Sequence, residues 1–276
     1  MYKFLISFLF LLINTLNHAQ NKVTVLPPVL VETSALIKYK CSFLTINDSG
    51  NEEKIYVFNK RGKIKHTCVL KNATNVDWEA LAYDGEEYLY VGDFGNNANK
   101  RKDLVIYKVK MEDVLKNESV DAEKIFFNYP DQNQFPPQKS ELYFDAEGLI
   151  LKDNQLIVFT KNRTVPFDGI SKVYTLPTEP GTYQAKLQND LKLPPTNWRE
   201  ESITDATYFD GELFILTYAK VYQLVWENSS WVQKKEYKHD SWTQKEGITV
   251  DDKFIYLTDE NASGFFTGNY LYKLKK

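Results

Sequence analysis

The sequence predicts an all-β fold, a single β-propeller of five four-stranded blades, and three observations favour it. First, the chain holds 18 tyrosines and 17 phenylalanines, residues that pack well on pleated sheets, whereas helical periodicity is scarce. Second, a short motif of an acidic, a small and an apolar residue recurs along the chain. Third, each copy is followed by a turn and a second apolar run, as repeated blades around a channel require.

The repeated motif marks the first strand of each predicted blade. Four copies begin with an acidic residue and the first copy is degenerate: Ser34-Ala35-Leu36, Glu79-Ala80-Leu81, Glu147-Gly148-Leu149, Asp205-Ala206-Thr207 and Glu246-Gly247-Ile248. Turn-forming pairs such as Asp84-Gly85 and Asp210-Gly211 follow the motif. Each motif is therefore predicted to open a β-hairpin.

The later strands of each unit repeat as well. Second strands are expected at residues 43–46, 89–91, 156–159, 213–216 and 254–257. Every third strand begins with an apolar residue and a tyrosine: Ile55-Tyr56, Ile106-Tyr107, Val173-Tyr174, Val221-Tyr222 and Leu271-Tyr272. Fourth strands are expected at residues 64–70, 124–129, 184–187 or 191–193, and 232–237.

No fourth strand follows the fifth unit, so its outer strand must come from elsewhere. Residues 23–26 precede the first motif and belong to no other unit. We expect this N-terminal strand to close the ring, because an open ring would leave an exposed sheet edge. A six-bladed ring stays an alternative if residues 108–143 or 176–201 contain a divergent unit.

The first twenty residues predict a signal peptide. Lys3 precedes an apolar run at residues 4–13, and a polar stretch with small residues follows up to Gln20. A retained membrane anchor is the alternative, but it needs about 20 apolar residues and the run has about half of them. We expect a secreted or periplasmic protein, with one propeller domain over residues 21–276 and no membrane span.

Composition excludes several classes of partner and chemistry. The chain carries 34 basic and 37 acidic residues, a net charge of -3, and no basic stripe that would neutralise nucleic acid. Beyond the predicted signal peptide only His66 and His239 remain, both expected at outer strands. A Ser-His-Asp triad or an imidazole zinc site is therefore not expected. We expect a monomer that binds a small-molecule or protein ligand at the channel face.

Repeat register predicts an acidic mouth at one end of the channel, because first strands begin and second strands end on the same face. The inner ring is predicted to contain Glu79, Glu147, Asp205 and Glu246, with Asp48, Asp93, Lys161, Tyr218 and Asp259 above it. At about 6 Å and an effective dielectric near 20, each pair of carboxylates repels by on the order of 3 kcal/mol. Such a ring needs a cation, shared protons or strong hydrogen bonds.

A divalent cation is the first candidate for this neutralisation. Oxygen ligands without sulfur or imidazole suit calcium or magnesium, so Glu79, Glu147, Asp205 and Glu246 are the predicted ligands. Two alternatives stay open: each acid caps backbone N–H groups, or Lys161 neutralises the network. No catalytic residue is predicted, because no nucleophile with an adjacent base stands out in the motif.

Some motifs resemble those of mostly uncharacterised exported bacterial propeller proteins, over nearly the whole chain beyond the signal peptide. They are Asn47-Asp48-Ser49-Gly50, Asp77-Trp78-Glu79-Ala80, Gly92-Asp93-Phe94-Gly95-Asn96-Asn97 and Asp145-Ala146-Glu147. More distantly, the Glu-Gly unit is similar to that of calcium-dependent lactonase and esterase-like phytase propellers, which have six blades as a rule. That similarity implies metal-binding roles for Glu147 and Glu246.

These observations lead to three candidate functions. The preferred one is a binding or scaffold protein with an ion at the channel mouth. A rival is a metal-dependent hydrolase of lactone, ester or phosphoester substrates, in which a ring carboxylate acts as base and Lys161 and Arg163 hold an anionic group. A third is glycoside cleavage by paired carboxylates, which requires two acids about 5 to 9 Å apart.

The two cysteines are predicted to stay unpaired. Cys41 opens the second strand of blade one, and Cys68 lies near the end of its fourth strand. These strands run parallel, so the thiols are expected at opposite ends, too far apart for a disulfide. We expect both to be buried apolar residues.

Export predicts a defined new N-terminus. N-terminal sequencing of the exported protein should begin near Gln20 or Asn21, because small residues precede this point. A protein that keeps Met1 would contradict the signal-peptide interpretation.

Overall fold

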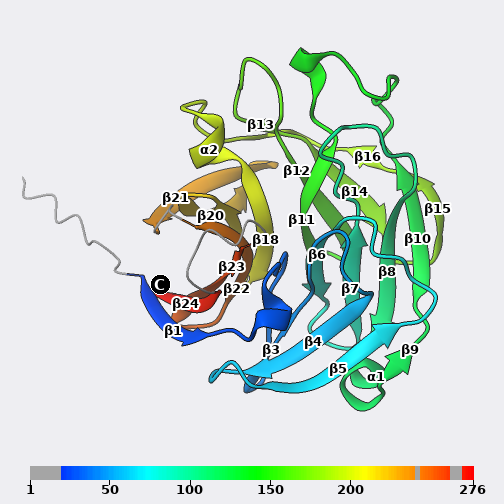
Figure 1. The fold of residues 1–276 in the computed structure, drawn as a ribbon. Helices are drawn as coiled ribbons and strands as arrows, with labels where there is room; N and C mark the ends of the chain where they lie inside the picture. The colour runs from blue at the N-terminus through cyan, green and yellow to red at the C-terminus, as the bar shows by residue number, and fades with distance from the viewer. Residues whose placement is uncertain (1–19, 240–242, 262–268) are drawn as a thin grey trace, which may run out of the picture.

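The computed structural model describes residues 20–239, 243–261 and 269–276. Residues 1–19, the predicted signal peptide except for Gln20, lie outside this part of the chain. Five four-stranded sheets stand in a ring, which confirms the five-bladed propeller (Figure 1). None of the described helices has the length and apolar character needed to cross a bilayer.

The blades follow one another along the chain, each from the channel outward. Blade one contains β2 (Ile37–Tyr39), β3 (Ser42–Thr45), β4 (Lys54–Asn59) and β5 (Ile64–Leu70). Blade two contains β6 (Trp78–Tyr83), β7 (Tyr88–Asp93), β8 (Leu104–Lys110) and β10 (Glu123–Asn128). Blade three contains β11 (Asp145–Lys152), β12 (Gln155–Lys161), β14 (Val173–Pro177) and β16 (Lys186–Leu187). Blade four contains β18 (Ile203–Phe209), β19 (Glu212–Thr217), β20 (Lys220–Glu227) and β21 (Ser230–Lys238).

The last blade joins the two ends of the described chain. It contains β22 (Gln244–Val250), β23 (Phe254–Glu260), β24 (Tyr270–Lys275) and, as its outer strand, β1 (Asn21–Val25). β1 runs antiparallel to β24, and Leu26 N–H then donates to the carbonyl of Asn269 at 2.8 Å. In Figure 1 the two strands lie side by side, β1 in blue and β24 in red. The predicted closure by an N-terminal strand is confirmed.

The long connections contain short strands and helices rather than a sixth blade. β9 (Ser119–Val120) extends blade one, and β15 (Gly181–Gln184) joins blade two in parallel with β10. β13 (Ile170–Ser171) pairs with β17 (Leu191–Lys192). The helical segments are α1 (Met111–Lys116), α2 (Trp198–Glu201), and the 3-10 turns η1 (Pro28–Leu30) and η2 (Lys139–Glu141).

Buried tyrosines explain the apolar-tyrosine repeat of the third strands. All five rings are nearly buried, and four hydroxyls donate to a group outside their own strand. The acceptors are the Thr74 carbonyl for Tyr107, Asp131 for Tyr174, Glu201 for Tyr222 and Asp259 for Tyr272. All five rings therefore fill the core between blades, and in blades two to five the hydroxyl group also fixes a neighbouring segment.

The cysteines are free, as expected, but their burial differs from the prediction. Cys68 is buried in the core, and burial raises the pKa of its thiol to about 11. Cys41 is exposed, because it lies in the tight turn between β2 and β3 rather than inside a strand. The prediction of a buried Cys41 is therefore wrong.

Ring closure should depend on β1. Deleting residues 21–28 removes the outer strand of the last blade and should lower the melting temperature by several degrees, since each ~1 kcal/mol lost costs about 2–4 °C in a domain of this size. A chain that starts at Gln20 is the matched control in thermal denaturation. Equal melting temperatures for the two chains would show that β1 does not hold the ring together.

Candidate functional site

A β-bulge in each described first strand of blades two to five marks the repeated motif. The register shifts between Trp78 and Ala80, between Ala146 and Gly148, between Ile203 and Asp205, and between Lys245 and Gly247. The extra residues are Glu79, Glu147, Thr204 and Glu246. Because a bulge redirects one side chain out of the ladder, three glutamates are free to point away from their sheets.

The fourth copy of the motif is one residue out of the predicted alignment. Thr204, not Asp205, takes the bulge position, and its hydroxyl donates to the Lys245 carbonyl at 2.6 Å. Ser34 of blade one does the same to the Trp78 carbonyl, also at 2.6 Å. In both cases the acceptor is the residue before the next blade's glutamate, so the hydroxyls link neighbouring blades.

Asp205 makes contacts of the kind that the capping alternative describes. One carboxylate oxygen accepts from Ala206 N–H at 2.7 Å, and the other accepts from Ile248 N–H of the next blade at 2.8 Å. This position corresponds to Gly148 in blade three and Gly247 in blade five, where a Cβ would crowd the following blade. That Asp205 binds a cation therefore remains a prediction, which an experiment has to test.

Glu79, Glu147 and Glu246 meet at one mouth of the channel, together with Asp48 at the end of the second-strand segment of blade one. Burial raises the pKa of Glu79 well above its usual range, and the charges of Glu147, Asp48, Asp77 and Glu246 add to this effect. Glu79 itself is 4% exposed. Glu79 is therefore a buried acid that binds a proton strongly in the absence of another cation.

Two further acids belong to this mouth and were missed. Burial, followed by the charges of Asp48 and Asp145, raises the pKa of Asp77 to about 7. Burial, followed by the charge of Glu246, raises the pKa of Glu260 to about 10. Asp77 stands two residues before Glu79 in the Asp-Trp-Glu motif, but it precedes β6 and the bulge at Glu79, so strand alternation does not indicate its direction.

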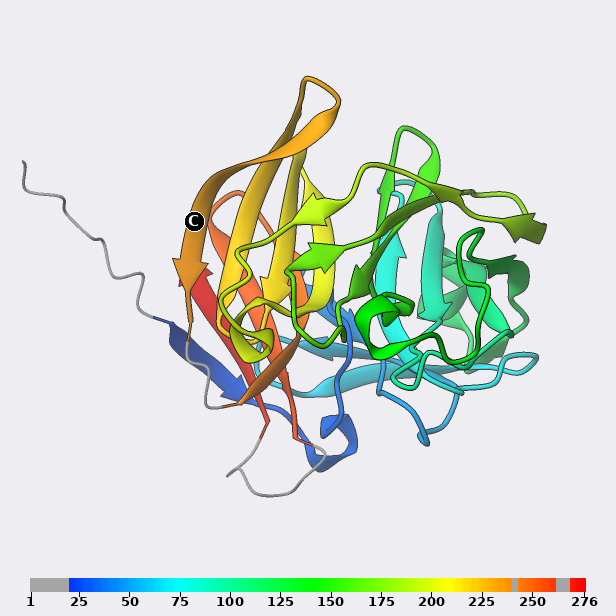
Figure 2. The same ribbon diagram turned by 90° about the horizontal axis from the view of Figure 1, so that it is seen from above.

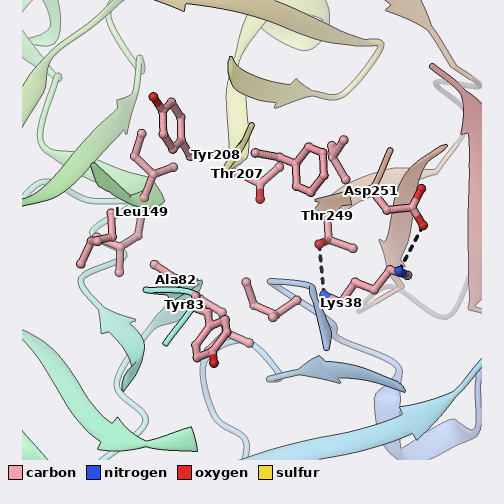
Figure 3. A pocket seen from close by; sticks show the side chains of 15 residues that line it. Lys38, Ala82, Tyr83, Leu149, Thr207, Tyr208, Thr249 and Asp251 are labelled. Atoms are coloured by element: carbon pink, nitrogen blue, oxygen red, sulfur yellow. Dashed lines mark hydrogen bonds and ion pairs between the residues drawn. The ribbon is translucent and has the colours of Figure 1, made fainter. Parts of the chain in front are cut away.

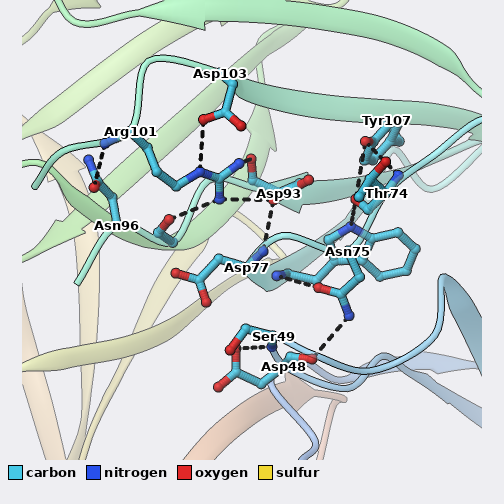
Figure 4. Close-up of polar contacts among 12 residues, drawn as sticks. Asp48, Ser49, Thr74, Asn75, Asp77, Asp93, Asn96, Arg101, Asp103 and Tyr107 are labelled. Carbon is cyan, nitrogen blue, oxygen red and sulfur yellow. Dashed lines mark hydrogen bonds and ion pairs between the residues drawn. The ribbon is translucent and has the colours of Figure 1, made fainter. Parts of the chain in front are cut away.

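Two residues predicted for the mouth have separate partners. Asp93 forms an ion pair with Arg101 at 2.9 Å and accepts from Asp77 N–H at 3.0 Å, as Figure 4 shows. Asp259 forms a buried ion pair with Lys245 at 2.6 Å. Both acids therefore pair with a basic side chain of their own blade.

Lys161 and Tyr218 lie among the mouth glutamates. Lys161 Nζ donates to Glu147 Oε1 at 2.9 Å, and Tyr218 donates its hydroxyl proton to Glu246 Oε1 at 3.0 Å. Burial alone would lower the pKa of Lys161, but Glu147, Tyr218 and Glu246 raise it well above its usual range. Glu147 Oε2 is buried and has no hydrogen-bond partner among the described residues. One oxygen of the mouth is therefore left for a further partner.

Asp48, Asp77 and Glu79 form the tightest acidic cluster, with one carboxylate oxygen from each lying within 4.8 Å of the others. No basic side chain in the described part of the chain forms an ion pair with any of the three. Figure 4 shows Asp48 and Asp77 approaching from blades one and two. Two oxygens that each lie about 2.3–2.6 Å from one Ca²⁺ are at most about 4.6–5.2 Å apart, so these three fit a calcium ion.

Gly95 explains part of the Gly-Asp-x-Gly-Asn-Asn motif. A Cβ at this position would lie 2.5 Å from Asp77 Cγ and 2.6 Å from Glu79 Oε1. The absence of a side chain therefore makes room for both carboxylates. Asn96 N–H donates to Asp145 at 2.6 Å, which ties the same loop to blade three.

The opposite end of the first strands holds a separate cavity. It has a volume of about 250 Å³ and is lined by residues from all five blades (Figure 3). Lys38 Nζ lies 3.1 Å from Asp251 on its rim, and Lys38 N–H donates to Thr249 Oγ1 at 3.1 Å. Its charged groups are paired with each other, so the unbalanced charge of the channel is at the acidic mouth.

Comparisons with known proteins support the fold. No family model and no curated protein matches the sequence. Among solved structures, glutaminyl cyclase from Myxococcus xanthus is similar with a TM-score of 0.54 and 11% identity, over 93% of this chain and 97% of that one. The PQQ-bound aldose sugar dehydrogenase from Streptomyces coelicolor is similar with a TM-score of 0.50 and 9% identity, over 93% of this chain and 98% of that one.

The raised pKa of Asp77 predicts a pH-dependent stability in metal-free buffer. A carboxyl with a higher pKa in the folded state stabilises the fold below its unfolded pKa of 3.8, and this contribution is lost as the pH rises through about 7. Asp77→Asn should therefore raise the melting temperature by several degrees at pH 8 and by much less at pH 4.

Asp121→Asn is the matched control, because Asp121 is exposed and pairs with Lys71 at the surface, at 3.0 Å. It should change the melting temperature little at either pH. A pH profile for Asp77→Asn that runs parallel to that of the unmodified protein would contradict the proposed protonation.

Proposed function

We propose that this chain is an exported propeller that binds a divalent cation, calcium in the first place, at the acidic mouth of its channel. The observation that carries this proposal is the cluster of Asp48, Asp77 and Glu79, whose oxygens lie within the reach of one calcium ion. The unpartnered Oε2 of the buried Glu147 supports it, because this oxygen points to a missing donor or cation.

Electrostatics gives the binding its driving force. Neighbouring carboxylates repel Asp77 and Glu260 and, together with burial, raise the pKa of Asp77 to about 7 and that of Glu260 to about 10, so both bind protons more readily than ordinary carboxyls. A cation would replace these protons and relieve the repulsion in a site of low dielectric constant. Binding should therefore weaken as the pH falls below about 7, where Asp77 is protonated.

Export is consistent with such a site. The apolar run at residues 4–13 favours a secreted or periplasmic location, and the Asp-Trp-Glu motif resembles exported propellers. Extracellular calcium modules have dissociation constants of about 10⁻⁴–10⁻³ M, so a site with three carboxylates is strong enough outside the cell.

A metal-dependent hydrolase of lactone, ester or phosphoester substrates is the second candidate. Lys161 Nζ lies 2.9 Å and the Arg163 guanidinium 3.8 Å from Glu147 Oε1. These two cations could hold an anionic group beside the acidic cluster, and Glu246 could serve as a base. A bound cation would polarise the substrate's reacting oxygen.

Calcium should stabilise the protein and the cluster variants should lose this effect. At a hundred times the dissociation constant, binding to the folded state alone adds about 2.7 kcal/mol, which raises the melting temperature by several degrees. Glu79→Gln removes a ligand charge, and Gly95→Ala displaces the Asp77 and Glu79 carboxylates. Both should reduce the calcium-induced shift, measured by thermal denaturation and by calorimetric titration against chelator-treated protein.

Asp205→Asn separates the ligand role from the capping role. If Asp205 only caps the Ala206 and Ile248 N–H groups, this variant has a lower melting temperature and keeps the full calcium shift.

Identical melting curves of the unmodified protein in calcium and in chelator would rule out the cation site. Turnover of lactone, aryl ester or phosphoester substrates in calcium but not in chelator would favour the hydrolase.

A further inference from the structure

A second pocket lies on the outer part of the molecule, between blades three and four. It has a volume of about 150 Å³ and is lined by residues of β11, β12, β14, β20 and β21 and of the loops beside them. The outer strand of blade four has nine residues, whereas that of blade three has two. The β20–β21 hairpin, in orange in Figure 2, therefore projects from the ring and forms one wall of the pocket.

Two tryptophans from this hairpin line the pocket. Trp226 and Trp231 are directly opposed in the β20–β21 register, with ring centroids 5.0 Å apart and an interplanar angle of 69°. A cross-strand aromatic pair stabilises a hairpin, but it does not require an open cavity beside it. Trp226 is 44% exposed, which is costly for so large an apolar side chain; Lys152 Nζ lies 5.8 Å from the centroid of its ring, and the rest of its surface is available.

The remaining lining contains two aliphatic residues, Ile157 and Val173, but is otherwise polar, and it has no net charge. Lys152 and Asp153 are its charged residues, and they form an ion pair with each other. Gln188 donates to Thr175 Oγ1 at 3.1 Å, which fixes its amide. Gln155 is exposed in the lining, so its amide is available to a ligand. The pocket therefore combines indole rings with amides, a hydroxyl group and balanced charges.

We propose that this pocket binds a neutral saccharide. The C–H face of a pyranose ring is apolar and packs on an indole, while its hydroxyl groups both donate and accept and thus match the amides of Gln155 and Gln188. The balanced charge of the lining disfavours acidic or basic ligands. The cavity volume of about 150 Å³ suits a ligand of the size of one sugar unit.

Tryptophan fluorescence and calorimetric titration with methyl glucoside, methyl galactoside, maltose and cellobiose test this proposal. At least one of these sugars should bind with a millimolar dissociation constant, that is, with about 4 kcal/mol. Trp226→Ala and Gln155→Ala should each weaken that binding about tenfold or more. Neither residue lies near the acidic mouth, so calcium-induced stabilisation should persist in both variants.

Trp198→Ala is the matched control, because Trp198 is 37% exposed but belongs to α2 and packs against Tyr218 of the channel mouth. It should leave sugar binding unchanged. Circular dichroism and thermal denaturation establish that the variants fold, and Trp226→Phe keeps an aromatic face if Trp226→Ala does not fold. Absence of binding by all four sugars, or equal binding by Trp226→Ala, would show that the tryptophans only stabilise the hairpin.

Discussion

Pairing of β1 with β24 is the constraint on which the rest of the molecule depends. This pairing joins the first described strand to the last blade and leaves no open gap in the ring. Closure fixes the distance between blade one, which supplies Asp48, and blade five, which supplies Glu246 and Glu260. Without closure the acids of the mouth would move apart and relieve their repulsion, so the ring maintains an arrangement that its own charges oppose.

Most of the fold could be predicted from the sequence, because a propeller repeats one simple unit. The pairs of an apolar residue and a tyrosine located the third strand of each of the five blades. Residues 23–26 indicated the closing strand. The outer strand of blade three was ambiguous, because residues 181–192 divide among three sheets. No local pattern reveals such a division, since strand propensity does not say which sheet a strand joins.

The acidic mouth was harder to predict than the fold, because side chains alternate across a strand. A register error of one residue moves a side chain to the opposite face. The prediction was one residue off at two positions. The bulge residue of blade four is Thr204, not Asp205, and the acid that faces Glu246 is Glu260, not Asp259. Asp77 was visible in the Asp-Trp-Glu motif, but only contacts between blades one and two bring it beside Asp48.

The position of β15 makes two blades mechanically dependent on each other. Along the chain, β15 follows β14 of blade three. In space, β15 runs parallel to β10 and completes the sheet of blade two. Blade three therefore cannot open from its outer edge without uncovering blade two. In hydrogen exchange, the amides of these two blades would therefore open as one cooperative unit. During synthesis on the ribosome or refolding, the sheet of blade two could not be completed before residue 184 is available.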